Sequence, residues 1–170
     1  MYITESYWGE YMGGTDDSLT LLEYLAAKGR EEIPVGEIFA DFGLDTAQGD
    51  FRSHTPLVYT NSEGWEMEIH CAIDLLTDLA ALLLECDKNG GLDTQELEMD
   101  THLPALRITA APRERALLVE ALRDFADHPL DYDLGEMVPE EEMREILENA
   151  RHYVALGREQ LESPTDNSGV

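Results

Sequence analysis

The sequence predicts a mainly α, single-domain helical bundle around a central hydrophobic helix, with up to two short strands. The chain has 170 residues, a length that fits one domain of ordinary size. Hydrophobic residues make up 43% of it, too many for a disordered chain, and they recur at helical spacing in five segments. One segment, about residues 65–86, is apolar over most of its circumference and is expected at the centre of the fold.

We expect one globular domain over residues 1–162. The last eight residues, 163–170, read SPTDNSGV and have the composition of a flexible tail.

The first two helices are expected at residues 15–29 and 35–43. Thr15 is a typical N-cap residue and Gly29 a typical stop, and the leucines between them share one face. The second helix follows Pro34 and spans only two turns. Residues 45–56 have the composition of a loop, and residues 56–60 that of a short strand before the turn-prone Asn-Ser-Glu-Gly sequence.

The central helix, residues 65–86, carries its polar side chains in a narrow stripe. Glu66, His70, Asp74 and Asp78 are each one helical turn apart, which places them on one face. Four possible metal ligands on a single helix do not resemble a di-iron site, which uses Glu-x-x-His pairs on two helices. We therefore expect no metal there, and interpret the stripe as facing solvent or a partner.

The second half of the chain predicts one strand and two helices. Residues 103–109 form the candidate strand. Pro112 begins an amphipathic helix that ends at His128-Pro129. Pro139 precedes the last helix, whose first turn contains three consecutive glutamates, as suits a helix N-terminus.

Charge limits the classes of partner. The chain has 37 acidic and 11 basic residues, a formal net charge of −26. Phosphate backbones and anionic lipids repel such a polyanion, so we expect no nucleic-acid binding and no membrane binding. A partner with a basic surface is the natural alternative. The first residues lack the basic and apolar regions of a signal peptide, which predicts a cytoplasmic location.

Residues 87–96, Asp-Lys-Asn-Gly-Gly-Leu-Asp-Thr-Gln-Glu, resemble the calcium loop of an EF-hand. An EF-hand loop has about 12 residues and ends on a bidentate glutamate, whereas Glu96 is only the tenth residue from Asp87. A degenerate calcium-binding module stays open as an alternative. We favour a Gly-Gly turn after the central helix, followed by a short helix capped by Asp93 or Thr94.

Motifs specific to enzymes are absent from the sequence. It has no Gly-x-Ser-x-Gly, no phosphate-binding glycine loop, no His-Glu-x-x-His and no Cys-x-x-Cys. We expect no enzyme activity, no catalytic residues and no cofactor. The sequence Asp131-Tyr-Asp133 resembles a glycosyltransferase metal motif, but three residues in so acidic a chain arise easily by chance.

Binding is the remaining function. Aromatic residues concentrate near the N-terminus among carboxylates, a combination that suits contact with Lys and Arg on a partner. The alternative is that these aromatics cover one end of the core. The predicted partner-binding residues are Tyr7, Trp8, Glu10, Tyr11, Asp16, Asp17, Glu66, His70 and Asp74.

Two segments, residues 15–24 (TDDSLTLLEY) and residues 62–85 (SEGWEMEIHCAIDLLTDLAALLLE), resemble the immunity proteins of bacterial polymorphic toxin systems. The resemblance implies a stoichiometric inhibitor that is made beside its toxin. The resulting hypothesis is that the acidic surface covers the active site of a cognate toxin domain with a basic surface. A nucleic-acid mimic that inhibits DNA-binding proteins is the alternative.

Overall fold

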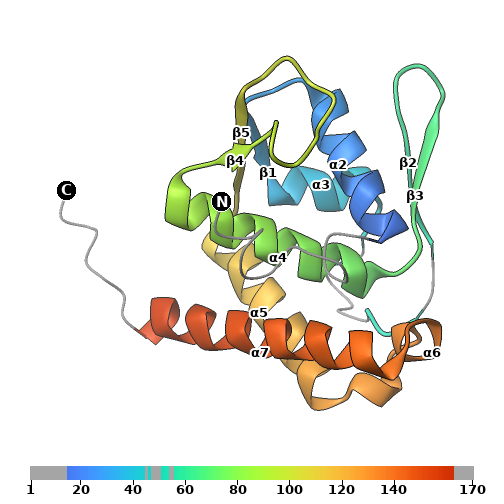
Figure 1. The fold of residues 1–170 in the computed structure, drawn as a ribbon, viewed down its shortest axis with the longest axis vertical. Helices are drawn as coiled ribbons and strands as arrows, with labels where there is room; N and C mark the ends of the chain where they lie inside the picture. The colour runs from blue at the N-terminus through green and yellow to red at the C-terminus, as the bar shows by residue number, and fades with distance from the viewer. Residues whose placement is uncertain (1–14, 45, 47–50, 54–55, 163–170) are drawn as a thin grey trace.

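The computed structural model describes residues 15–44, 46, 51–53 and 56–162. Figure 1 shows one long helix in the middle of the molecule with further elements on both sides. The elements are α2 (Asp16–Lys28), β1 (Glu32–Pro34), α3 (Val35–Asp41), β2 (Leu57–Thr60), β3 (Glu66–Ile69), α4 (Ala72–Asn89), β4 (Leu92–Asp93), β5 (Ala105–Thr109), α5 (Pro112–Asp127), η1 (Pro129–Asp131), α6 (Leu134–Met137) and α7 (Glu140–Glu162). The tail predicted over residues 163–170 lies outside the described residues.

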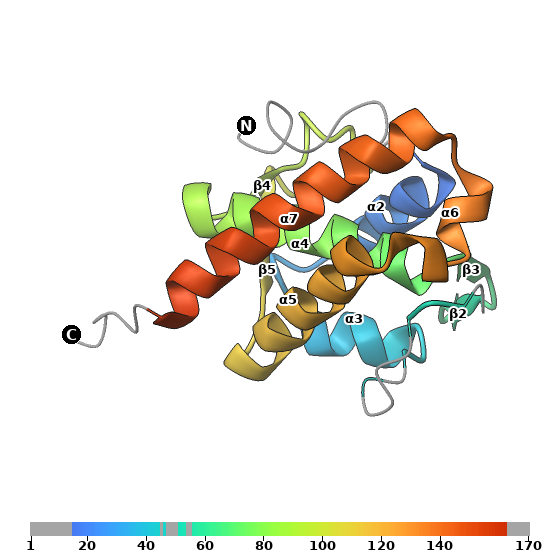
Figure 2. The ribbon, with the colours of Figure 1, turned by 90° about the horizontal axis from the view of Figure 1, so that it is seen from below.

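Helix α4 is the centre of the fold, as predicted. Its first fifteen residues, Ala72–Cys86, are all buried. Helices α5 and α7 pack against each other and cover one side of α4, while α2, β4 and β5 cover the other. Figure 2 shows α7 and α5 crossing the same side of α4. A helix that is apolar all round requires this enclosure, because any open side would expose leucines to water.

Local signals account for the helix ends. The Thr15 hydroxyl accepts a hydrogen bond from the Ser18 amide and begins α2, and Gly29 ends it in the left-handed conformation, at φ 63°. Pro112 begins α5, and the Glu114 carboxylate accepts from the Ala111 amide at 2.8 Å. These boundaries confirm the sequence-based prediction.

The prediction of a mainly α domain with up to two short strands is confirmed in part: the fold is rich in helix, but it contains two small sheets and five strands among the described residues. One sheet has the order β1-β5-β4, with β1 parallel and β4 antiparallel to β5. Ile33 of β1 lies opposite Ile108 of β5, and both are buried. The predicted strands at 56–60 and 103–109 are present as β2 and β5. Strands β1 and β4 have three and two residues, too few to leave a periodic pattern in the sequence.

The central helix begins at Ala72 and not at Trp65, which corrects the prediction of a helix over 65–86. Residues 66–69 form β3, the second strand of an antiparallel hairpin with β2. Glu66 and Glu68 point outward, while Ile69 is buried and Met67 is half-buried. This alternation has the period of a strand. The polar stripe predicted on one helix face therefore does not exist, because Glu66 and His70 precede the helix.

We predict that Leu79→Ala lowers the free energy of unfolding by about 3 kcal/mol, because Leu79 is fully buried in α4 and truncation leaves a cavity. Urea denaturation followed by circular dichroism measures the change. Leu19→Ala is the matched control: Leu19 is exposed on α2, and the expected change is below about 0.5 kcal/mol. Equal effects of the two substitutions would contradict the central position of α4.

Candidate partner-binding surface

The structure separates the residues that were predicted to bind a partner. Four of them lie outside the described residues: Tyr7, Trp8, Glu10 and Tyr11. Three are exposed: Asp16, Glu66 and His70. Two are buried: Asp17 and Asp74. The two buried carboxyl groups belong to the interior. Of the predicted partner-binding residues that the structure describes, the three exposed ones therefore stay candidates for contact with a partner.

Asp17 connects α2 to the start of α4. Its carboxylate accepts hydrogen bonds from the backbone amides of His70, at 2.9 Å, and Cys71, at 3.2 Å. It also bonds to Nδ1 of His70 at 2.8 Å, which raises the pKa of that imidazole. No side chain of α4 itself caps its N-terminus. Asp17 therefore places a negative charge beside the positive end of the α4 helix dipole.

Asp74 and Asp78 lie one turn apart on α4, facing the same junction. The Ser18 hydroxyl donates to Oδ2 of Asp78 at 2.7 Å. Burial raises the pKa of both carboxyl groups well above their ordinary value, and the charge of neighbouring Asp17 raises both further. Carboxyl groups in this environment hold protons closer to neutral pH, which reduces the cost of burying them.

Many of the basic side chains are engaged in ion pairs within the chain. Oδ1 and Oδ2 of Asp124 accept two hydrogen bonds from Arg52, at 2.7 and 3.0 Å, and Asp87 accepts two from Arg115, at 2.8 Å each. Among the described residues, the basic side chains that lie within ion-pair distance of carboxylates include Lys28, Arg30, Arg52, Arg115 and Arg123. These pairs leave a large excess of carboxylates on the surface.

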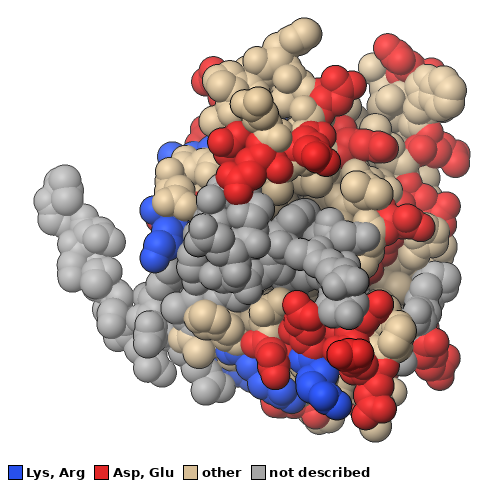
Figure 3. Space-filling model, in the orientation of Figure 1, with Lys and Arg blue, Asp and Glu red and all other residues tan. Residues whose placement is uncertain are grey.

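The excess acidity is visible on the face shown in Figure 3. Asp and Glu side chains lie in patches across its upper part and along its right-hand edge, over the β4–β5 region, α2 and the β2–β3 hairpin, and again at the bottom beside Lys and Arg. Lys and Arg are confined to the left edge and the bottom of this view. The hairpin side of the molecule therefore presents predominantly negative charge to a partner.

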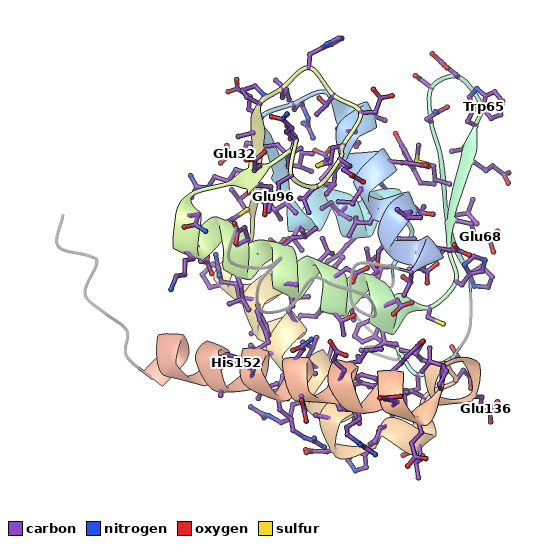
Figure 4. The ribbon with its side chains drawn as sticks, in the orientation of Figure 1. Glu32, Trp65, Glu68, Glu96, Glu136 and His152 are labelled. Atoms are coloured by element: carbon purple, nitrogen blue, oxygen red, sulfur yellow. The ribbon has the colours of Figure 1, made fainter. Side chains whose placement is uncertain are left out.

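The β2–β3 hairpin adds an aromatic side chain to this acidic region. Trp65 follows its turn and is 69% exposed. In Figure 4 it lies at the far end of the hairpin, with Glu68 nearer the base, whereas Glu32 and Glu96 lie on the other side of the molecule. Exposed aromatics beside carboxylates are the composition that protein interfaces use to bind basic partners.

A groove of about 850 Å³ lies between α3 and α5. Its floor is apolar and includes Phe39 and Leu117. The carboxylates at its rim are already engaged. Arg52 and the Tyr132 hydroxyl hold the pKa of Asp124 to about 2, and Glu114 caps α5. A carboxylate held in an ion pair at so low a pKa is a poor general base at neutral pH, so Asp124 is unsuited to that role.

The EF-hand-like segment forms a turn. Gly90 ends α4 in the left-handed conformation, at φ 84°, and Oδ1 of Asp93 accepts from the amides of Gln95 and Glu96 at 3.0 Å each. The predicted Gly-Gly turn is thus present, but residues 94–98 form turns and not the short helix expected after it, so Asp93 stabilises a turn and does not cap a helix. Within the described ranges, no cluster of three or more His, Cys, Asp or Glu side chains has an arrangement suited to a metal ion. None of the helices described here combines the length and the apolar character needed to cross a membrane.

The family follows from a comparison of the whole sequence. The model of the family described as immunity protein 68 matches residues 2–155, nearly the entire chain. The chain belongs to the immunity protein 68 family. This membership confirms the resemblance to immunity proteins seen in residues 15–24 and 62–85, and it indicates a toxin-neutralising role. No curated protein and no solved structure gives a significant match.

Sequence patterns predicted the first strand of the hairpin and its turn, but they did not predict the second strand, β3, or the exposed position of Trp65. The apolar circumference of residues 65–86 predicts that Trp65 begins the central helix, whereas this residue lies between β2 and β3. The strict alternation of Glu and apolar residues over 66–69, directly after a turn sequence, was the signal for a strand. The same alternation would have placed Glu66 and Glu68 on one outward face beside Trp65.

We predict that the protein loses stability as pH rises from about 5 to about 8. The pKa values of Asp74, Asp78 and His70 are raised in the folded state, so each group binds protons more tightly there than in the unfolded chain. Their stabilising contribution is complete at low pH and is lost as pH rises through the folded-state pKa values. Thermal and urea unfolding across this pH range measure the effect.

Asp78→Asn tests the origin of this pH dependence. The amide oxygen still accepts from Ser18, but the side chain no longer titrates, so the slope of unfolding free energy against pH becomes shallower by up to about 1 kcal/mol per pH unit. Asp74→Asn is a second test at the same junction. Asp100→Asn, at an exposed position, is the control and leaves the slope unchanged. Stability that is flat with pH in the unsubstituted protein would refute the assignment.

Proposed function

We propose that this immunity protein neutralises a cognate bacterial toxin domain by binding its basic surface and covering its active site. The observation that carries the proposal is the acidic hairpin side of the molecule, where exposed carboxylates surround an exposed tryptophan. Family membership supports toxin neutralisation in general. Occlusion needs no catalytic group, so the inhibitor acts in stoichiometric amounts and without enzymatic turnover.

Charge complementarity supports the choice of a basic partner. A formal charge of −26 attracts a cationic protein over a distance of about one Debye length and speeds its association. Electrostatic steering of this kind raises association rates to about 10⁸ M⁻¹s⁻¹ or more. Fast capture suits an inhibitor that has to bind a toxin before the toxin reaches its substrate. We place this encounter in the cytoplasm, where a toxin made beside its inhibitor is present first.

The experiment is capture of the partner from the native bacterium with tagged protein, eluted with a salt gradient. Recovery of one basic toxin domain whose activity is then blocked by an equimolar amount of this protein supports the proposal. Recovery of several unrelated DNA-binding proteins would instead establish a nucleic-acid mimic. A shift of the melting temperature by Ca²⁺ that EDTA reverses would establish the calcium-binding alternative.

We predict that the affinity for the toxin domain falls at least about tenfold between about 50 and 500 mM NaCl, because salt screens the contact between carboxylates and Lys or Arg. Isothermal titration calorimetry at both salt concentrations measures the dissociation constants. Melting curves of both proteins at each concentration serve as the control that they stay folded. An affinity that does not change with salt would contradict a contact based on charge.

A further inference from the structure

Given toxin binding as proposed above, we infer that the β2–β3 hairpin is the element that contacts the toxin, with the Trp65 indole seated among Lys or Arg side chains of its basic surface. The occupant is thus a cationic protein surface, recognised by an aromatic ring and the carboxylates around it. Three properties of the hairpin support this assignment: a base fixed to the core, a rigid turn, and an outward face with only negative charge.

The base of the hairpin is fixed by its inward-facing side chains. Leu57 and Ile69 lie opposite each other across the two strands and are buried in the core. The Tyr59 ring meets the Tyr24 ring edge to face, with centroids 5.2 Å apart. The Nζ atom of Lys28 lies 5.3 Å from the centroid of the Tyr59 ring. The hairpin therefore projects from the domain with its base packed against the core, and Figure 1 shows its direction.

The turn fixes the backbone at Trp65. Oδ1 of Asn61 accepts hydrogen bonds from the amides of Glu63 and Trp65, both at 2.9 Å. The Asn61 amide donates to the Trp65 carbonyl at 2.9 Å, and Gly64 has φ 87°, a conformation that other residues rarely adopt. The indole is consequently presented by an ordered backbone. Little backbone freedom is therefore lost on binding, which is the usual advantage of a preorganised contact.

The outward face of the hairpin carries one sign of charge. Residues 56–70 include no Lys or Arg. Glu63 in the turn and Glu66 and Glu68 on β3 are all exposed, and Val58, opposite Glu68, adds apolar surface. His70, the one residue there that can become cationic, already contacts Asp17. An indole among carboxylates attracts Lys and Arg through cation–π contact, through ion pairing, and through burial of their aliphatic stems.

Exposure alone does not distinguish Trp65, because Leu130 is even more exposed, at 94%. Leu130 belongs to a single 3-10 turn between α5 and α6. Neighbouring Asp131 lies 3.4 Å from Nη1 of Arg52, so the charge beside Leu130 is already paired within the chain. Leu130 therefore provides a matched control: a large exposed apolar side chain without a rigid acidic setting.

The test compares variants for binding to the toxin domain encoded beside this protein, purified and titrated by calorimetry. Trp65→Ala removes the indole, and the double variant Glu66→Gln/Glu68→Gln removes two charges from the outward face. Leu130→Ala and Glu31→Gln/Glu32→Gln are the controls, the latter removing two exposed charges from the other side of the molecule. Melting temperatures of all variants verify folding, which exposed positions perturb little.

We expect Trp65→Ala to weaken binding by about 30-fold or more, as an interface hot spot does. The glutamine pair on the hairpin should weaken it about tenfold, mainly at low salt, with both controls within about twofold. If the unsubstituted protein binds and blocks the toxin and both hairpin variants bind it equally well, the hairpin assignment is overturned. The proposed function would still stand in that case. A toxin domain that the unsubstituted protein does not bind would overturn both.

Discussion

Enclosing α4 is the constraint on which the rest of the fold depends. A helix of leucines with no exposed side needs cover in every direction, and the chain supplies it in two layers, α5 with α7 on one side and α2 with β4 and β5 on the other. The same enclosure traps the carboxyl groups of Asp74 and Asp78. Protonation and the Ser18 hydroxyl offset the cost of burying them, so the polar junction of α2 and α4 is a consequence of how completely α4 is covered.

Acidic side chains thus serve two separate purposes in this protein. Asp17 caps α4, and Asp124 and Asp87 hold Arg52 and Arg115 against the body, so these carboxylates contribute to the fold. Those on the hairpin and its surroundings form a negative surface, which keeps the protein soluble but destabilises the compact state because like charges repel one another. A basic toxin surface of the kind proposed above would relieve this repulsion on binding.

Local sequence signals predicted most of the helices. The remaining elements depend on contacts between residues far apart in the chain. Thr15, Gly29 and Pro112 mark helix ends by their own chemistry, and the sequence shows them directly. Residues 66–69 fit both a helix and a strand, and the choice is made by the partner strand and by Asp17, which binds the amides of His70 and Cys71 from 53 and 54 residues away. For the site, sequence indicated the acidic character and Glu66, but it could not show that Asp17 and Asp74 face inward. Helical spacing tells which residues share a face and not which face is covered.

The parallel pairing of β1 with β5 has a consequence for the timing of folding. Glu32 lies opposite Arg107, 75 residues later in the chain, so the first sheet cannot close until β5 has been translated. At about 5–20 residues per second, that segment alone takes several seconds to synthesise. The helices α5 and α7, which complete the cover of α4, come later still. A partly made chain therefore lacks the finished core, so each copy needs the synthesis of nearly its whole length before it can present a folded surface to a partner.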